Sequence, residues 1–386
     1  MMVRFGDFVV HNRSPLLWGM SLVVIVLVAN VPRNELNDVF LHWFDQSIQF
    51  RTDTDFALDN LTGLYTTEYS LRSGESGGIS KPEFLAEVEA FANWMRQQHG
   101  VRHVRSFTDI MKRLNKNLHE DAETMYRLPG ERALAAQYLL LYEMSLPYGL
   151  DLNNQINVDK SSVRLTATTD TLSTKEILAL SAMAAEWLET NAPHIDARPA
   201  SGAVIMFANI GHRNVRAMLL GTTIALALIS CILIAALRSV KIGIVSLIPN
   251  LVPAAMGFGL WGIFVGEVGL SLSIVMSMTL GIVIDDTVHF LSKYLRARRE
   301  QGLNPQDAVR YAFRTVGRAL LVTSIILVVG FSVLAQSGFA ANGDMGLLTA
   351  VVIALAIFAD FLFLPPLLMK IEDKKDRRSR NPVALS

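Results

Sequence analysis

The sequence predicts a membrane α-helical protein, in which six spanning helices form a bundle and one α+β domain lies outside the cytoplasm. Composition is the first observation. Of the 386 residues, 51% are apolar and only 18% are charged, which is less charge than soluble domains usually carry. The second observation is the distribution of the apolar residues, which gather near the N-terminus and after residue 216. The third is the stretch between them, residues 33–213, which shows the strand and helix patterns of an ordinary folded domain.

The first predicted span covers residues 16–32 and follows a cytoplasmic leader at residues 1–15. Its uncharged run is short, because a helix that crosses the bilayer needs about 20 residues, and residues 8–10 could extend it. A cleaved signal peptide is the alternative. No small-x-small cleavage site follows Val31, so we favour a retained helix.

Five further spans complete the predicted bundle within residues 214–369. Apolar runs predict these helices at residues 217–237, 242–265, 268–292, 319–337 and 345–369. The third span of the chain contains Pro249, Pro253 and several glycines. Membrane helices tolerate such residues, because neighbouring helices satisfy the backbone and small residues allow close packing.

Basic residues near the predicted helix ends set the orientation, because Lys and Arg concentrate on the cytoplasmic side. They precede the first span, join the second to the third and the fourth to the fifth, and form a tail at residues 370–386. The short loops on the other side contain none. We therefore expect both termini in the cytoplasm and residues 33–213 outside it.

The domain at residues 33–213 is predicted to contain two β-α-β units. The first consists of a strand, a helix that Ser80 would cap and a second strand, at residues 64–72, 81–99 and 101–107. The second repeats this order at residues 162–168, 174–190 and 197–203, and an inserted helix at residues 130–144 separates the two. Two such units form the ferredoxin-like, or split βαβ, fold.

An amphipathic helix is predicted at residues 304–316, on the cytoplasmic side. Asn304 would cap it, Pro305 would take its first position, and Asp307 would complement its dipole. We expect it to lie against the membrane surface, with its apolar residues inward: Val309, Ala312, Phe313 and Val316.

Charge and motifs exclude several classes of function. Residues 33–213 hold 17 Lys/Arg and 24 Asp/Glu, and the basic residues elsewhere flank apolar helices instead of forming one face, so we expect no nucleic-acid partner. The single cysteine, Cys231, lies in an apolar run and suits packing. We find no nucleophile motif, metal-ligand cluster or P-loop. We therefore expect neither an enzyme nor a metal or organic cofactor.

The fourth span carries two adjacent aspartates, Asp285 and Asp286. Asp286 lies seven residues from Lys293, or about 10 Å inside the helix. A charge at depth costs at least about 2.5–3.5 kcal/mol on insertion scales. Burial and a neighbouring carboxylate both disfavour the ionised form, so such a pair can hold a proton and titrate as a unit. This predicts a proton relay; simple hydrogen bonding to neighbouring helices is the alternative.

Four other polar residues in the spans could support a relay. His289 lies one turn from Asp285, although a histidine near an interface can also snorkel or cap. Thr323 and Ser324 lie at a similar depth to the aspartates, about 8 Å from Arg318, and could instead act as ordinary links between helices. Asp360 is about 15 Å deep and needs a partner that the sequence does not identify.

Four stretches of the chain resemble the resistance-nodulation-division (RND) superfamily, and within it the MMPL-type exporters. IPNLVP at residues 248–253 resembles the third helix of each half of these proteins, and GIVIDDTVHF at residues 281–290 resembles their proton-relay motif. Residues 317–367 resemble their last two helices, and residues 50–63 the start of their outer domain. The order of elements is also that of the family.

The resemblance is to one six-helix half, the C-terminal one, whereas the family usually has twelve helices in two halves. MMPL-type members often pair the aspartate with a tyrosine, and efflux members place a lysine opposite the acids. Here the pair is Asp285–Asp286, and no lysine lies inside a predicted span.

The resemblance implies a proton-driven transporter in the bacterial inner membrane that exports lipids or other hydrophobic molecules. It also implies a porter-type outer domain. A SecF-like accessory of protein translocation and a non-transporting lipid sensor of the sterol-sensing type are the alternatives.

A second six-helix half is the expected partner, because transporters usually bind their coupling ion between two repeats. Symmetry favours a homodimer. A heterodimer with a separately encoded half is one alternative, and a fragment of a longer protein is the other.

Overall fold

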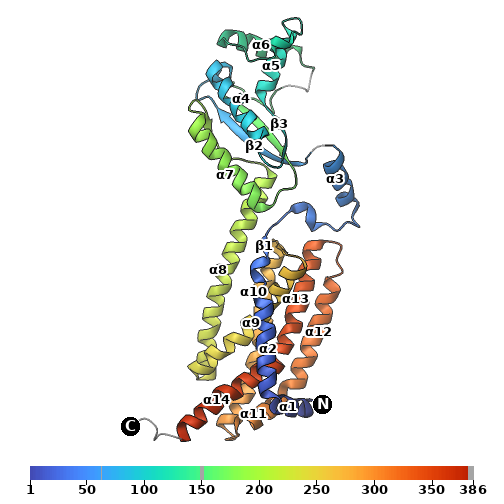
Figure 1. Ribbon diagram of the computed structural model, residues 1–386, viewed down its shortest axis with the longest axis vertical. Coiled ribbons are helices and arrows are strands. Elements are labelled where there is room, and N and C mark those ends of the chain that lie inside the picture. The colour runs from blue at the N-terminus through green and yellow to red at the C-terminus, as the bar shows by residue number, and fades with distance from the viewer. Residues whose placement is uncertain (62, 148–151, 381–386) are drawn as a thin grey trace, which may run out of the picture. The chain divides into compact units, whose positions relative to one another are not determined.

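The computed structural model describes residues 1–61, 63–147 and 152–380, without the side chains of residues 373–380. The chain divides into two compact units. The helical unit contains Met1–Asn37, His42–Asp45 and Arg213–Ser386, and the α+β unit contains Asp38–Leu41 and Gln46–His212 (Figure 1). Each unit is described by itself. The predicted basic tail lies partly outside the described residues, at 381–386.

In the described part of the chain, six helical segments are long and apolar enough to cross a membrane, which confirms the predicted number of spans. They are Arg13–Arg33, Ala203–Leu237, Val240–Phe264, Leu270–Arg299, Pro305–Leu334 and Ala340–Glu372. The first contains α2 (Arg13–Val28), and the next three are α8 (Ala203–Leu237), α9 (Val240–Phe264) and α10 (Leu270–Arg299). The boundary between the two units falls inside α8.

The last two spans are each interrupted by a π-helical turn. The fifth runs from α11 (Pro305–Ala312) through η5 (Phe313–Gly317) into α12 (Arg318–Leu334). The sixth runs from α13 (Ala340–Phe358) through η6 (Ala359–Phe363) into α14 (Leu364–Arg380). A π turn inserts an extra residue into a helix and occurs frequently at functional sites.

Small residues allow α9 to pack closely in the helical unit. A Cβ atom at Gly259 would collide with the carbonyl of Leu27 in α2, and one at Gly257 would collide with the side chain of Val352 in α13. Close approach of this kind is how membrane helices associate. The third and sixth spans, which contain α9 and α13, are also the most buried of the six candidate spans in the described residues. Figure 1 shows α10, α13 and α12 running side by side.

Helix α1 (Met2–His11) is separate from α2 and ends at Asn12, so the predicted extension of the first span through residues 8–10 is wrong. Asn304 does cap α11, because its Oδ1 accepts the backbone N–H of Asp307 at 2.9 Å. The apolar side chains of Val309 and Phe313 are fully buried in a cluster with α1, α10 and α14. They therefore pack against protein, not against the membrane surface as predicted.

The α+β unit contains one four-stranded sheet in the order β3-β4-β2-β5. Its elements are β2 (Tyr65–Arg72), α4 (Pro82–Arg96), β3 (Val101–Arg105), β4 (Ser162–Thr169), α7 (Thr174–Asn191) and β5 (Asp196–Ala197). All three strand pairings are antiparallel. Alternate strand residues such as Leu71, Val104 and Leu165 form a core with α4 and α7, and the opposite face of the sheet carries polar side chains.

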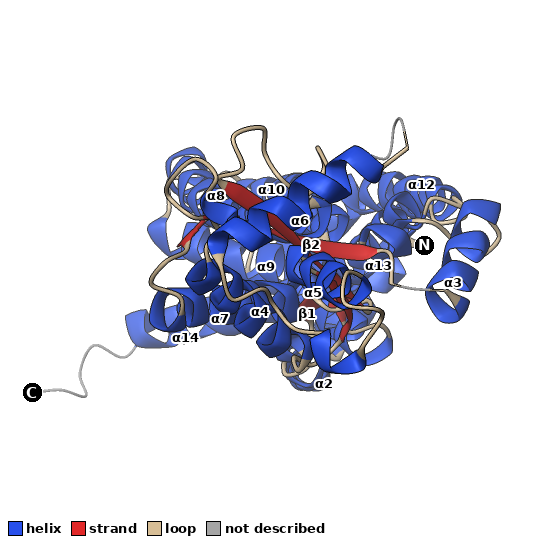
Figure 2. Ribbon diagram, turned by 90° about the horizontal axis from the view of Figure 1, so that it is seen from above, coloured by secondary structure: helices blue, strands red, loops and turns tan. Residues whose placement is uncertain are grey.

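Three further helices belong to the α+β unit: α3 (Gln49–Asn60), α5 (Phe107–Asn117) and α6 (Arg132–Ser145). The remaining elements are short. They are the 3-10 turns Val31–Arg33, Phe40–Trp43, Gly78–Ser80 and Glu123–Met125, and the two-residue strands β1 (Glu35–Leu36) and β6 (Glu267–Val268), which pair in parallel within the helical unit. In Figure 2 the strands are red among predominantly blue helices.

Three boundaries in the α+β unit differ from the prediction. Ser80 ends a 3-10 turn, and α4 begins after Lys81 without a side-chain cap. The predicted strand at 101–107 ends at Arg105, because Ser106 and Asp109 form a capping box that starts α5. The predicted strand at 197–203 is only two residues long, because Gly202 has a φ of +116° and Ala203 already begins α8.

Candidate functional site

The candidate site lies in the helical unit, where a buried and a half-buried acidic side chain come from two neighbouring helical segments. Asp286 is on α10 and Asp360 is in η6, and Thr287, the residue after Asp286, forms a hydrogen bond with Asp360. Asp360 is only 2% exposed, although the sequence identified no partner for it. Its location in a π turn means that an irregular backbone carries the most buried acid of the bundle.

Thr287 provides the partner of Asp360. The hydroxyl of this fully buried residue donates to Asp360 Oδ1 at 2.9 Å. Thr287 follows Asp286 directly on α10, so one helical turn positions both the acid and the donor. Thr287 was not predicted as a site residue, although it lies within the stretch that resembles the relay motif.

Ser324 on α12 is the partner of Asp286, as the similar depth of the two residues predicted. Its hydroxyl lies 2.9 Å from Asp286 Oδ2 and also 2.8 Å from its own helix's Leu320 carbonyl. A hydroxyl has a single hydrogen, so Ser324 can donate to one of these acceptors at a time. Thr323 does not join the site, because it is exposed and bonds to the Ala319 and Leu320 carbonyls.

Asp285 and Asp286 point in different directions, as neighbours on a helix must. The Asp285 side chain is 73% exposed in the single chain, and it lies beside His289, with Nε2 3.4 Å from Oδ1. Within the described residues, no hydrogen bond links Asp285 or His289 to the cluster of Asp286, Ser324, Thr287 and Asp360. Their role in a relay stays a prediction.

Two further buried polar side chains were not singled out by the sequence analysis. Asn250 on α9 and Thr349 on α13 are fully buried, and within the described residues neither the Asn250 amide nor the Thr349 hydroxyl has a hydrogen-bond partner. Gly257 lies against Val352, and consecutive spans alternate in direction. Asn250 lies seven residues before Gly257, and Ala359 lies seven residues after Val352. Because the two spans run in opposite directions, Asn250 is at the level of Ala359, the residue before Asp360. The signal that could have found Asn250 was its place between the two prolines of α9.

The α+β unit contains a mainly apolar cavity of about 200 Å³. Phe40 and Phe207 stack in its wall, with ring centroids 5.5 Å apart, and Asp38, Tyr65 and Thr174 add polar groups. Among the described residues, no group of three or more His, Cys, Asp or Glu could hold a metal ion.

Six apolar segments long enough to span a membrane, with the carboxyl groups of Asp286 and Asp360 among them, indicate a multi-pass membrane protein. The comparison with known families makes this specific: the model of the MMPL family matches residues 158–381, which is more than half of the chain and includes every acid of the site. The chain belongs to the MMPL family and represents one half of an RND-superfamily, MMPL-type protein. No curated protein matches it.

Proposed function

We propose that this chain is a proton-driven secondary transporter that exports lipids or other hydrophobic molecules across the bacterial inner membrane. The observation that carries the proposal is the acid cluster. Two carboxyl groups, on α10 and in η6, lie inside the bundle, and each accepts a hydrogen bond from a hydroxyl on a neighbouring spanning segment. Membership of the MMPL family supports a transporter of the RND type for hydrophobic substrates.

The geometry at Ser324 suits a site that gains and loses a proton. When Asp286 is ionised, the Ser324 hydroxyl donates to it. When Asp286 is protonated, the carboxyl can donate to Ser324, and the hydroxyl then turns to the Leu320 carbonyl, which is also within reach. Both states keep the buried groups hydrogen-bonded, which avoids the cost of an unsatisfied polar group.

Asp360 supplies a second position for the proton. Like charges that lie close together in a low-dielectric environment disfavour double ionisation, so Asp286 and Asp360 would share protons as a coupled pair. The unpaired amide of Asn250, level with this pair, fits a buried water molecule that links the acids to the rest of the bundle. We propose that protons pass along this route while the site alternates between the two sides.

The α+β unit would be a porter-type domain outside the cytoplasm, with both termini inside, as the basic residues at the helix ends predict. The strand order β3-β4-β2-β5, with α4 and α7 as the crossovers, supports a ferredoxin-like fold. Its apolar cavity has walls suited to a hydrocarbon chain. We propose transport, and not catalysis, as its role.

Gradient-driven export tests the proposal. The chain is reconstituted into liposomes with an imposed pH gradient, and translocation of a fluorescent phospholipid analogue is compared with uptake of protons by an enclosed pH dye. We expect Asp286→Asn and Asp360→Asn each to abolish the gradient-dependent movement of lipid and of protons. Asp344→Asn removes a carboxyl group from the same spanning segment as Asp360, away from the site. This variant should still move lipid and protons.

The same assay separates the two rival functions. A lipid sensor of the sterol-sensing type would bind the lipid without proton movement in any variant. A SecF-like accessory would move protons without moving lipid. Full activity in both Asp286→Asn and Asp360→Asn would refute proton coupling at this site.

We further propose that the chain works with a second six-helix half, most simply a second copy. The exposed face of α10 carries Gly281, Asp285, His289 and Ser292. This polar stripe is costly to place against lipid, and the small residues on it suit close contact between helices. A heterodimer with a separate half would cover the same stripe.

A further inference from the structure

A second cavity in the α+β unit has a different character from the apolar one. Its volume is about 550 Å³, within the range of small-molecule sites. It lies where β3 and the start of α5 meet the segment around Tyr126 and the end of α6. The Asn115 amide donates to the carbonyls of Met125 and Arg127, at 2.9 and 3.0 Å. These two bonds fix the backbone on either side of Tyr126, which lines the cavity.

The lining of this cavity is strongly basic, although residues 33–213 as a whole carry more acids than bases. Arg96, Arg105, Arg113 and His103 line it, and Asp109 is the single acid among its lining residues. Asp109 is already engaged by Arg96 at 2.7 Å and by Lys112 at 3.1 Å. It therefore does not neutralise the other two arginines.

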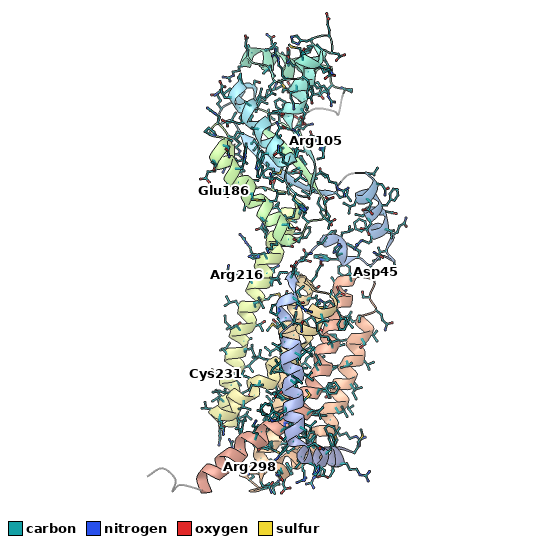
Figure 3. The ribbon with its side chains drawn as sticks, in the orientation of Figure 1. Asp45, Arg105, Glu186, Arg216, Cys231 and Arg298 are labelled. Carbon is teal, nitrogen blue, oxygen red and sulfur yellow. The ribbon has the colours of Figure 1, made fainter. Side chains whose placement is uncertain are left out.

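Arg105 and Arg113 are the two lining arginines to which Asp109, the acid of the lining, forms no salt bridge. Within the described residues, neither forms a salt bridge, whereas most other arginines of this unit do. Arg105, labelled in Figure 3, lies on β3 and is exposed, whereas the preceding residue Val104 is buried on the opposite face of the sheet. Arg113 approaches from α5. Two guanidinium groups from different elements thus line one concave space together with the hydroxyl and amide groups of Tyr126, Tyr142 and Gln155.

We propose that this cavity binds a phosphoryl group, held by Arg105 and Arg113. Guanidinium groups match phosphate oxygens with paired, charge-assisted hydrogen bonds. Two arginines that form no salt bridge within the described residues match the charge of a phosphate monoester, about −1.5 to −2 at neutral pH, and more than balance the single negative charge of a phosphodiester headgroup. The phosphoryl group could belong to a lipid headgroup or to a soluble phosphate compound. The site does not depend on proton coupling in the helical unit.

Equilibrium binding to the full chain in a non-ionic detergent without phosphate tests the site. Calorimetric titrations use inorganic phosphate, glycerol 1-phosphate, short-chain phosphatidylglycerol and the uncharged short-chain diacylglycerol. The double variant Arg105→Gln/Arg113→Gln is compared with Arg72→Gln, which removes an exposed arginine of the same sheet that does not line the cavity. Elution volume and thermal melting check that each variant is folded.

We expect phosphoryl ligands to bind the wild-type chain and Arg72→Gln equally. The double variant should bind at least about tenfold more weakly, because it lacks two charge-assisted contacts, and added salt should weaken wild-type binding. Binding of phosphatidylglycerol alone would identify a lipid headgroup as the source, and binding of the soluble phosphates would identify a soluble compound. Equal binding by the double variant, equal binding of diacylglycerol or no binding at all would overturn the proposal. The proposal of proton-coupled transport does not depend on this binding result.

Discussion

Each of the two acidic side chains in the bundle, Asp286 and Asp360, accepts a hydrogen bond from one hydroxyl group. Ser324 and Thr323 are neighbours on α12 with similar chemistry, yet only Ser324 turns inward to reach Asp286. Thr287 performs the same task for Asp360. Because a buried carboxyl group without a partner is costly, these hydroxyls determine whether each acid can stay in the interior in both protonation states.

Replacing Ser324 should therefore impair proton coupling, whereas replacing Thr323 should not. We expect Ser324→Ala to lower the rate of gradient-driven proton uptake by about tenfold, the loss that one hydrogen bond to a charged group implies. Thr323→Ala should stay within about twofold of wild type. The measurement is the initial rate of the enclosed pH dye in liposomes. Equal rates in the two variants would contradict the assigned role of Ser324.

The sequence identified most of this site but not its arrangement. Asp286, Ser324 and Asp360 stood out because polar groups are rare in apolar spans. Depth counted from basic residues placed Ser324 at the right level. Which side of the helix a residue faces depends on tertiary packing, so adjacent Asp285 and Asp286 could not be separated in advance. Thr287 was missed because a buried hydroxyl has no distinctive pattern in an apolar run, whereas Asn250 was missed although its place between Pro249 and Pro253 marked it.

At the scale of elements, an ionic network joins α4 to α5 in the α+β unit. Lys112 donates to Glu89 at 2.7 Å and lies 3.1 Å from Asp109, and Thr108 also donates to Glu89. Burial opposes ionisation of Glu89, but these two hydrogen bonds and the positive charges of Lys112 and Arg96 together outweigh it and hold its pKa below the ordinary value of 4.5. Burial likewise opposes the charge on Lys112, and the acids outweigh it and raise its pKa above 10.5.

This network should stabilise the unit across the neutral range. A carboxylate with a lowered pKa contributes stability above its unfolded pKa, and this contribution is lost as the pH falls through the folded value. The contribution of Lys112 is lost only as the pH rises through its own raised value. We expect Glu89→Gln to destabilise the unit by about 1–2 kcal/mol at pH 7, with a difference from wild type that shrinks as the pH falls below 4.5.

Hydrogen exchange of the α4 and α5 amides in the full chain measures this effect. Glu83→Gln is the matched control, because Glu83 is an exposed glutamate in the first turn of the same helix. It should change the exchange of these amides much less than Glu89→Gln does. A pH-independent difference between Glu89→Gln and wild type would show that packing, and not charge, accounts for the loss.

Helices were predicted well from the sequence where hydropathy or helical periodicity is strong. They were predicted poorly where tertiary packing determines the backbone conformation. Hydropathy placed all six spans, and helical periodicity placed α4 and α7 within a few residues. The π turns η5 and η6 have no such signal. Phe313 and Phe361, one in each turn, contact each other edge to face at 5.5 Å between centroids. Packing of this kind holds an extra residue in a helix, and sequence periodicity does not report it.

At the scale of the whole molecule, the exposed stripe of α10 makes assembly a testable consequence. Native mass spectrometry from mild detergent should show a species of two chains. Asp285→Asn should keep this dimer, because the amide remains polar, whereas Gly281→Leu should reduce it by blocking close approach. Gly330→Leu on α12 is the control, since Gly330 also has open space around it. A single-chain mass, together with gradient-driven transport by that species, would refute the assembly.

The central claim is that Asp286 and Asp360 together gain and lose a proton. Infrared difference spectroscopy of the reconstituted chain, cycled between acidic and alkaline pH, observes this directly through the carbonyl stretch of protonated carboxyl groups. The account predicts a titrating band that shifts in Asp286→Asn and Asp360→Asn, each affecting the other's signal because the two acids are coupled. Ser324→Ala should alter its frequency, because it removes a hydrogen bond. A spectrum that is unchanged by both aspartate substitutions would contradict the account.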